Sequence, residues 1–385
     1  MVSFAFHTVP TLVCQLDCAL DTATHCQRLG MKHVVVVTDK GVTGLQLHEE
    51  IVCNLQTAGL RVTVYDQIIA DPPEAIVIAA AEHARRAGVD GVIGLGGGSS
   101  MDVAKLIALL AHPEQQQPLA TMYGVEQVTG KRLPLIQIPT TAGTGSEVTP
   151  VAIVTTGETT KMGIVSRQLF ADVALLDANL TLGLPPAITA ATGIDAMVHA
   201  IEAYTSIRLK NPYADLLACE ALKMLDKHLQ TAIHDGHNPT ARQHMLLGAM
   251  LAGQAFANAP VAAVHALAYP LGGHFHLSHG HSNALVLVEV LKFNLPKAAH
   301  WYAELYSVLD PHCRGNDTEK AEKLINRLEQ HLVDSLIPLR LRELAVPESS
   351  LSLLARDAML QTRLLQNNPR PLTQQDALGI YRSIY

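Results

Sequence analysis

The first half of the chain alternates short apolar runs with stretches of helical periodicity. Apolar, β-branched runs that end in turn residues occupy residues 33–39, 60–66, 89–98 and 134–141, and residues 173–180 continue the series. Such nearly continuous apolar runs are typical of parallel strands that helices cover on both faces. The pattern therefore predicts a doubly wound, Rossmann-like α/β domain, whose ligands bind beyond the carboxyl ends of the strands.

The second half shows a different pattern, which begins after a proline pair at residues 185–186. Strand-like runs disappear there. The three- to four-residue period of helices takes over in three segments, which are residues 188–206, 213–229 and 241–257. We therefore expect two domains, an α/β domain over residues 1–182 and an all-helical domain over residues 183–385. The cleft between two such domains is the expected place for a ligand.

Composition and charge narrow the class of partner. The 385 residues carry a net charge of −7, and the 28 lysines and arginines form no basic run that could neutralise several phosphates, so we expect no nucleic acid partner. The sequence has no signal peptide and no uncharged stretch that approaches ~20 apolar residues, so we expect a cytoplasmic protein with no membrane partner. Six cysteines without a CxxC pair indicate reduced thiols. A small molecule is the expected ligand.

Two loops that follow strand-like runs could bind a nucleotide. In residues 94–102 (GLGGGSSMD), three successive glycines let backbone N–H groups approach an anion, and the next helix offers the positive end of its dipole to a diphosphate. The alternative is a tight turn whose serine and aspartate only cap the helix. Residues 138–149 (IPTTAGTGSEVT) offer hydroxyls to ribose, phosphate or carboxamide groups, although an ordinary loop would have the same composition.

Asp39 stands at the end of the first strand-like run. Its carboxylate could accept hydrogen bonds from a ribose hydroxyl and would repel a 2′-phosphate, which favours NAD(H) over NADP(H). The alternative is a simple turn residue in the sequence TDKG.

Histidines are concentrated in the helical half, where thirteen of the 19 follow Leu180. Asp195 and His199 are four residues apart and therefore share one helical face, and His265 and His279 come later in the chain. One carboxylate and three imidazoles suit Fe²⁺ or Zn²⁺ and do not suit Ca²⁺. The sequence therefore predicts a metal site.

Other histidines leave an alternative open. A single histidine is more often a core or surface residue than a ligand. His274, His276 and His281 surround one of the expected ligands, so residues 274–281 (HFHLSHGH) could themselves be a local metal-binding or solvent-facing tract.

The sequence resembles the iron-containing (group III) alcohol dehydrogenase family along nearly the whole chain. The matching motifs are VTDKG, GLGGGSSMDVAK, IPTTAGTGSEVT, GIDAMVHAIEAY, HALAYPLGGHF, HLSHGHSNA and a C-terminal NNPRPLT. The resemblance implies the dehydroquinate synthase-like architecture, with an N-terminal dinucleotide-binding domain and a C-terminal helical domain that holds one catalytic metal ion. It also implies a homodimer or a larger homo-oligomer.

The implied reaction is the NAD(H)-linked interconversion of a small primary alcohol or diol and its aldehyde by hydride transfer. The family's metal ligands, and with them the catalytic centre, correspond to Asp195, His199, His265 and His279. Only the resemblance favours Fe²⁺ over Zn²⁺. Together with the glycine-rich loop it gives the expected cofactor-binding residues, which are Asp39, Gly96, Gly97, Gly98, Ser99, Ser100, Asp102, Thr140, Thr141, Thr149 and Lys161.

Two positions depart from the family pattern. Tyr269 stands where many members have a second histidine that is proposed for the proton path. A phenol can donate and accept hydrogen bonds but is a poor base at neutral pH, so Tyr269 is a candidate for that path with altered chemistry. His281 stands at a usually apolar position and could support the site or lie at the surface.

Three alternatives to this reaction remain at the level of sequence. Two are related enzymes, a zinc glycerol dehydrogenase and a dehydroquinate synthase-like lyase, which the chain resembles less in GIDAMVHAIEAY and NPRP. The third is a non-catalytic sensor of metal or nucleotide that has kept the fold. The complete set of expected metal ligands speaks against the sensor.

Overall fold

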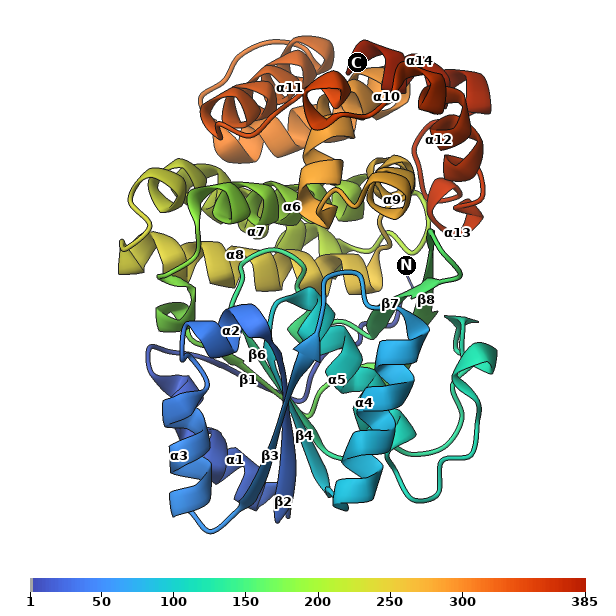
Figure 1. The fold of residues 1–385 in the computed structure, drawn as a ribbon. Coiled ribbons are helices and arrows are strands. Elements are labelled where there is room, and N and C mark those ends of the chain that lie inside the picture. Colours follow the sequence, from blue (N-terminus) through green and yellow to red (C-terminus); the bar gives the residue numbers. More distant parts are fainter. Residues whose placement is uncertain (1–2) are drawn as a thin grey trace. The chain divides into compact units, whose positions relative to one another are not determined.

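The computed structural model describes residues 3–385, which form two compact units (Figure 1). One unit is His7–Gly183, and the other is Leu184–Tyr385 together with residues 3–6. The chain passes from one unit to the other just before Pro185 and Pro186, where proline supports the start of a long helix because its φ is already helical.

The first unit is built on a six-stranded sheet in which every neighbouring pair is parallel. In spatial order its strands are β1 (Thr11–Cys14), β9 (Val173–Leu176), β6 (Leu135–Pro139), β4 (Gly91–Gly96), β2 (His33–Asp39) and β3 (Arg61–Ile68). Five of them, all except β1, are the runs expected from the apolar pattern. The predicted doubly wound α/β fold is confirmed.

Helices cover both faces of this sheet, with α1 and α3 on one side and α4 and α5 on the other (Figure 1). The helices of this unit are α1 (Thr22–Arg28), α2 (Lys40–Gly44), α3 (Glu49–Thr57), α4 (Glu74–Ala87) and α5 (Gly98–Leu110). The valines of β2 are completely buried because side chains on both faces of a central parallel strand meet helices. This burial explains the continuous apolar runs.

A second, smaller sheet is a feature that the apolar pattern does not predict. It contains β5 (Gly124–Val125), β8 (Thr160–Val165) and β7 (Val151–Thr156), and the last two form an antiparallel hairpin. The apolar pattern does not predict β1 either. This strand has only four residues and lies at an edge of the large sheet.

The second unit is entirely helical, as predicted. Its helices are α6 (Pro186–Thr205), α7 (Pro212–His234), α8 (Pro239–Asn258), α9 (Ala263–Phe275), α10 (His279–Leu309), α11 (Asp317–Asp334), α12 (Leu351–Ala358), α13 (Thr362–Leu365) and α14 (Gln374–Ser383). Helix α6 is buried on almost every side, which explains its apolar sequence, because α7, α8 and α10 all pack against it. Within residues 3–385, no single helix is long and apolar enough to cross a membrane. Helices α8 and α9 are long and apolar enough only when taken together, and the chain bends by 106° between them.

Candidate metal centre and nucleotide loops

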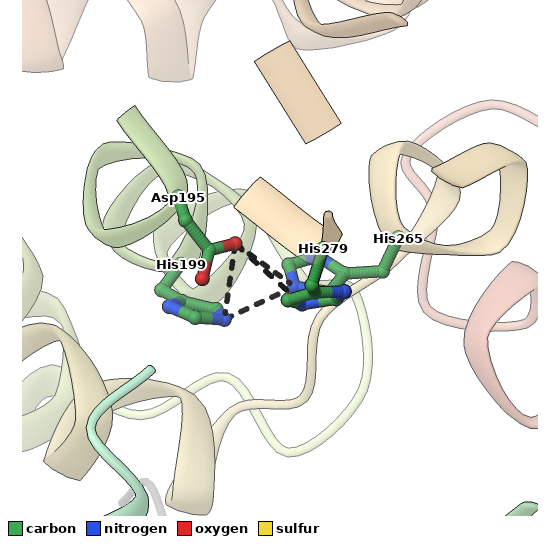
Figure 2. A group of neighbouring side chains, drawn as sticks. All are labelled: Asp195, His199, His265 and His279. Atoms are coloured by element: carbon green, nitrogen blue, oxygen red, sulfur yellow. Dashed lines mark hydrogen bonds and ion pairs between the residues drawn. The ribbon is translucent and has the colours of Figure 1, made fainter. Parts of the chain in front are cut away.

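Four metal-binding side chains converge inside the helical unit. Asp195 and His199 project from neighbouring turns of α6, His265 from the first turn of α9, and His279 from the first residue of α10 (Figure 2). One ligand atom of each lies within 4.8 Å of the others. The first three residues are buried and His279 is partly exposed, so the cluster has one side that water or a substrate can reach.

The distances within the cluster suit one shared ion. The Oδ1 atom of Asp195 lies 3.8, 3.9 and 3.6 Å from the Nε2 atoms of His199, His265 and His279, respectively. The Nε2 atoms of His199 and His265 are 3.0 Å apart. Ligands at roughly 2.0–2.2 Å from a common ion are themselves about 3–4 Å apart, so the residues fit a divalent metal ion of the Fe²⁺ or Zn²⁺ type.

Burial and charge act in opposite directions on Asp195. Burial alone would raise the pKa of its carboxyl group, but the three nearby imidazoles and a hydrogen bond from Asn283 lower the pKa overall. The Asn283 Nδ2 atom donates to Asp195 Oδ1 at 2.6 Å and lies 3.3 Å from the Nε2 atoms of both His265 and His279. Sequence reasoning missed Asn283, although it follows His279 by one turn of α10 and therefore shares its face.

Glu202 is a second residue that the sequence analysis missed. Its carboxylate is buried in α6 and contacts His265 on the side of the ring that faces away from the cluster, with 2.7 Å between Oε2 and Nδ1. The signal was present in the sequence, since Glu202 follows His199 by three residues and is, with Asp195, one of two carboxylates in an otherwise apolar helix.

The three additional histidines lie outside the metal cluster. The Nε2 atom of His274 lies 2.8 Å from the carboxylate of Asp357, and the Nε2 atom of His281 lies 2.7 Å from the carbonyl oxygen of Pro338. His276 ends α9 in a left-handed conformation. Among the described residues 3–385, the only group of metal-ligating side chains found is that of Asp195 and its three histidines.

Two aromatic rings border the cluster. Phe256 stacks on His199 with 4.4 Å between ring centroids, and the ring of Tyr269 lies 6.0 Å from that of His279. Tyr269 is buried one turn after His265 in α9. The structure thus brings Tyr269 near the cluster, while its part in a proton path stays a prediction.

In the α/β unit, the glycine-rich loop joins β4 to α5. Gly96 has φ of +153°, and a Cβ atom there would lie 2.8 Å from the side chain of Ser100. A Cβ atom on Gly98 would lie 2.8 Å from Thr144. Gly97 is the N-cap of α5 and has room for a Cβ atom, with its nearest neighbour at 3.7 Å. The loop is therefore tightly packed at Gly96 and Gly98, and it leads into the N-terminus of a 13-residue helix, where an anion is favoured.

Asp39 lies beside this loop, because β2 and β4 are neighbouring parallel strands and end at the same edge of the sheet. Its Oδ1 atom accepts hydrogen bonds from the backbone N–H groups of Gly41 and Val42 and so caps α2, at 2.9 and 3.1 Å. Its Oδ2 atom accepts from the Ser100 hydroxyl at 3.0 Å. Asp39 thus links two of the expected cofactor-binding segments.

Asp102 and Lys105 connect α5 to the second predicted loop. The Asp102 carboxylate accepts from the Ser146 hydroxyl at 2.6 Å and from the Ile153 backbone N–H at 2.9 Å. The fully buried Lys105 ammonium donates to Ser146 Oγ at 2.7 Å and to Thr149 Oγ1 at 3.3 Å. These hydrogen bonds attach the loop of residues 138–149 to α5 within the protein. A direct contact of Asp102 with a cofactor stays a prediction.

Lys161, in β8, has a partner that the sequence did not reveal. Its Nζ atom lies 2.6 Å from Asp71 Oδ1, and the backbone N–H of Asp71 donates to the Ser99 hydroxyl at 3.3 Å. Asp71 is in a left-handed conformation, with φ of +50°. Thr140 follows β6 directly and its N–H donates to the carbonyl of Gly96, while Thr141 is the neighbour nearest to Gly97. The expected cofactor-binding residues are therefore grouped around the carboxyl ends of β2, β4 and β6, with Lys161 and Thr149 joined to them by these contacts.

The comparisons with known proteins agree with this architecture over the whole chain. Residues 10–178 match the family described as iron-containing alcohol dehydrogenase, and residues 189–385 match the C-terminal part of the Fe-containing alcohol dehydrogenase family. The chain is similar to long-chain-alcohol dehydrogenase 1 of Geobacillus thermodenitrificans, with 40% identity over 93% of this chain and 91% of the relative.

Two further similarities extend over nearly complete chains. The NAD-dependent methanol dehydrogenase of Bacillus methanolicus is 32% identical over 98% of this chain and 99% of its own length. The crystal structure of a 1,3-propanediol oxidoreductase superposes with a TM-score of 0.95 at 33% identity and covers 100% of both chains. The chain belongs to the iron-containing alcohol dehydrogenase family. Membership makes it an oxidoreductase that acts on alcohols, with a histidine and aspartate metal site.

Proposed function

We propose that this protein catalyses the reversible, NAD(H)-linked oxidation of a small primary alcohol or diol to the corresponding aldehyde at a metal ion, with Fe²⁺ as the first candidate and Zn²⁺ as the second. The observation that carries the proposal is the buried convergence of one carboxylate oxygen and three imidazole Nε2 atoms in the helical unit. Family membership supports the reaction class.

Each of the four residues has a definable part in this site. Asp195, His199, His265 and His279 would hold the ion, which when bound would supply a Lewis acid for the alcohol oxygen. The Asp195 carboxylate partly neutralises the charge of a divalent ion, and Asn283 keeps that carboxylate aimed at the cluster through its 2.6 Å bond. Partial exposure of His279 leaves access on its side of the cluster. Tyr269 is the proposed group for passing a proton to solvent through its hydroxyl.

The α/β unit is the proposed site of the dinucleotide, which supplies the hydride acceptor. The backbone around Gly97 and the N-terminus of α5 would bind the diphosphate, while Asp39 would accept from a ribose hydroxyl. A 2′-phosphate would meet the Asp39 carboxylate, so we expect NAD(H) to be preferred. The name of the NAD-dependent relative from Bacillus methanolicus supports this choice.

The names of related enzymes and one aromatic ring bear on the substrate. The names of the similar proteins refer to long-chain alcohols, to methanol and to 1,3-propanediol, so they share an alcohol and differ in its length, and methanol and 1,3-propanediol are primary alcohols. Phe256 stacks on His199, and we expect its ring to limit the size of the group bound next to the cluster. A homodimer or larger assembly and a cytoplasmic location also stay predictions.

The test is turnover by protein that is purified anaerobically, stripped of metal and then given Fe²⁺ or Zn²⁺. NADH formation is followed over a panel of primary alcohols and diols, and NADH consumption over the matching aldehydes. We expect activity only after metal is restored. Full activity without metal would refute the proposed site. Silence over the whole panel with metal and NAD both bound would favour the lyase or the non-catalytic sensor.

A further inference from the structure

The starting observation is that α9 begins without a cap from its own sequence. Its N-cap residue, Ala262, has no side chain that could satisfy the exposed N–H groups of the first turn. Glu202 of α6 replaces that cap: its Oε2 atom accepts from the Ala262 N–H at 2.9 Å, and its Oε1 atom accepts from the Val264 N–H at 2.7 Å. The carboxylate is only 3% exposed and sits at the positive end of the α9 dipole.

The same carboxylate also controls one of the metal ligands. Oε2 of Glu202 lies 2.7 Å from Nδ1 of His265. A carboxylate can only accept, so this contact places the ring proton on Nδ1 and leaves the lone pair of Nε2 facing the cluster. Nε2 is the atom that lies 3.9 Å from Asp195 Oδ1 and is needed as a metal ligand.

One face of α6 therefore carries two ligands and the support of a third. Asp195, His199 and Glu202 follow one another at spacings of four and three residues, which keeps them on one side of the helix. The two capping bonds from Glu202 fix where α9 begins relative to α6. The contact between Glu202 and Nδ1 of His265 fixes the orientation of that imidazole ring in the first turn of α9. A C-terminal contact strengthens this junction, since the Asn367 amide donates to the carbonyl of Val261 at 2.8 Å, just before Ala262.

We infer that Glu202 is a positioning residue, which sets both the tautomer of His265 and the placement of α9, so that the metal site is assembled before the ion arrives. This inference rests on the proposed function in one respect, namely that the cluster binds a metal ion. It differs from a purely structural cap in one respect that can be measured, because only the inferred role requires a particular tautomer of His265.

The decisive variant is Glu202→Gln, which has nearly the same shape. An amide has one acceptor oxygen, so if it accepts from Val264 its NH₂ group faces His265 Nδ1. That arrangement favours a ring with the proton on Nε2, the nitrogen that should bind the metal. We expect the affinity for Zn²⁺, measured by competition with a chelator, to fall by roughly 10- to 100-fold. The matched control is Glu304→Gln, which removes a carboxylate that accepts from the Tyr204 hydroxyl and is not part of the metal cluster, and we expect parental Zn²⁺ affinity.

The second measurement observes the tautomer directly. In metal-free, full-length protein at a pH well above the imidazole reference value of about 6.5, histidine side-chain ¹⁵N NMR distinguishes a proton on Nδ1 from one on Nε2. We expect His265 to carry it on Nδ1 in the parent and in Glu304→Gln, and on Nε2 in Glu202→Gln. A parental His265 protonated on Nε2 would overturn the inference without any variant, so the test holds even if Glu202→Gln fails to fold.

The outcomes separate this inference from the proposed function. If the parent binds no Zn²⁺ or Fe²⁺, the proposed metal site fails, whatever Glu202 does. If the parent binds metal and Glu202→Gln binds it equally well with an unchanged tautomer, only the inference fails. Glu202→Asp keeps the charge but shortens the side chain by one methylene group, so it cannot keep all three bonds, and we expect an affinity between those of the parent and the glutamine variant.

Discussion

The two units of this protein build their candidate sites in opposite ways. In the α/β unit the proposed diphosphate site is backbone, since the glycine-rich loop follows one strand and leads straight into one helix. In the helical unit the site consists of side chains from three helices, α6, α9 and α10, and the backbone only positions them. The comparison teaches that a contiguous motif depends on local conformation, whereas a dispersed cluster depends on how helices pack.

Removal of a metal ligand should have the largest effect on activity. It should affect the site of the helical unit and leave that of the α/β unit unchanged. We expect His265→Ala to lose the metal and to reduce turnover by about 10³-fold or more, because a bound ion contributes several kcal/mol to transition-state stabilisation. NAD⁺ affinity, measured by fluorescence titration, should stay close to that of the parent. The control is His274→Ala, which removes a ring outside the cluster. Full metal content in His265→Ala would contradict the assignment.

A pair of glycine substitutions should separate folding from binding in the α/β unit. Gly96→Ala places a methyl group 2.8 Å from Ser100 at a positive φ, so we expect a loss of about 1–3 kcal/mol in the free energy of unfolding. Gly97→Ala meets no atom closer than 3.7 Å and should keep the parental stability. Both should weaken NAD⁺ binding while retaining metal. Parental NAD⁺ affinity in Gly97→Ala would show that the backbone does not approach the cofactor there.

Glu147 predicts a pH dependence that belongs to the α/β unit alone. Burial raises the pKa of its carboxyl group from 4.5 to about 7, so between these values the folded protein binds more protons than the unfolded chain. The contribution of Glu147 to the free energy of unfolding therefore falls as the pH rises from about 4.5 to 7. The expected decrease is on the order of 2–3 kcal/mol.

The measurement is chemical denaturation at several pH values in this range. Glu147→Gln cannot titrate and should show a flatter profile than the parent, which is the comparison to make. Identical profiles for the two proteins would show that Glu147 does not change its protonation in the folded state.

The smallest expected effect concerns cofactor choice. Asp39→Gly removes the charge that faces a 2′-phosphate, and we expect the ratio of kcat/KM for NAD⁺ over NADP⁺ to fall by roughly tenfold, or about 1.4 kcal/mol. Because glycine is itself an acceptable N-cap, the stability cost at α2 should be only a few tenths of a kcal/mol. Equal use of both cofactors by the unmodified protein would contradict the role of Asp39.

The sequence revealed whatever was periodic or contiguous. Buried strands such as β2 stand out because both of their faces are apolar, and the change to helical periodicity after the proline pair follows the same principle. Strand β1 escaped because a four-residue, partly exposed edge strand has too few positions to show a pattern. The small sheet escaped because its hairpin mixes polar and apolar residues in both strands.

At the sites, sequence reasoning found residue types and missed their partners. The four metal-binding residues have chemistry that is recognisable from their type, and the structure brings them together. Glu202 and Asn283 act through contacts made across helices, and the link between Asp71 and Lys161 joins residues that are 90 positions apart. Such contacts depend on tertiary packing, which no local pattern specifies, although the helical spacing from His199 to Glu202 was a usable signal.

The distance along the chain between the metal-binding residues has a consequence for how the protein unfolds. His279 follows Asp195 by 84 positions, so the four-residue site forms only when the chain folds, whereas the unfolded chain offers only local groups such as the histidines of residues 274–281. An ion that binds only the native state shifts the unfolding equilibrium by mass action, by about 2.7 kcal/mol at a free concentration of 100 times Kd. The melting temperature should therefore rise with the free metal concentration. The ion should act as a reversible, non-covalent cross-link between α6, α9 and α10, and a chelator should lower the melting temperature by removing it.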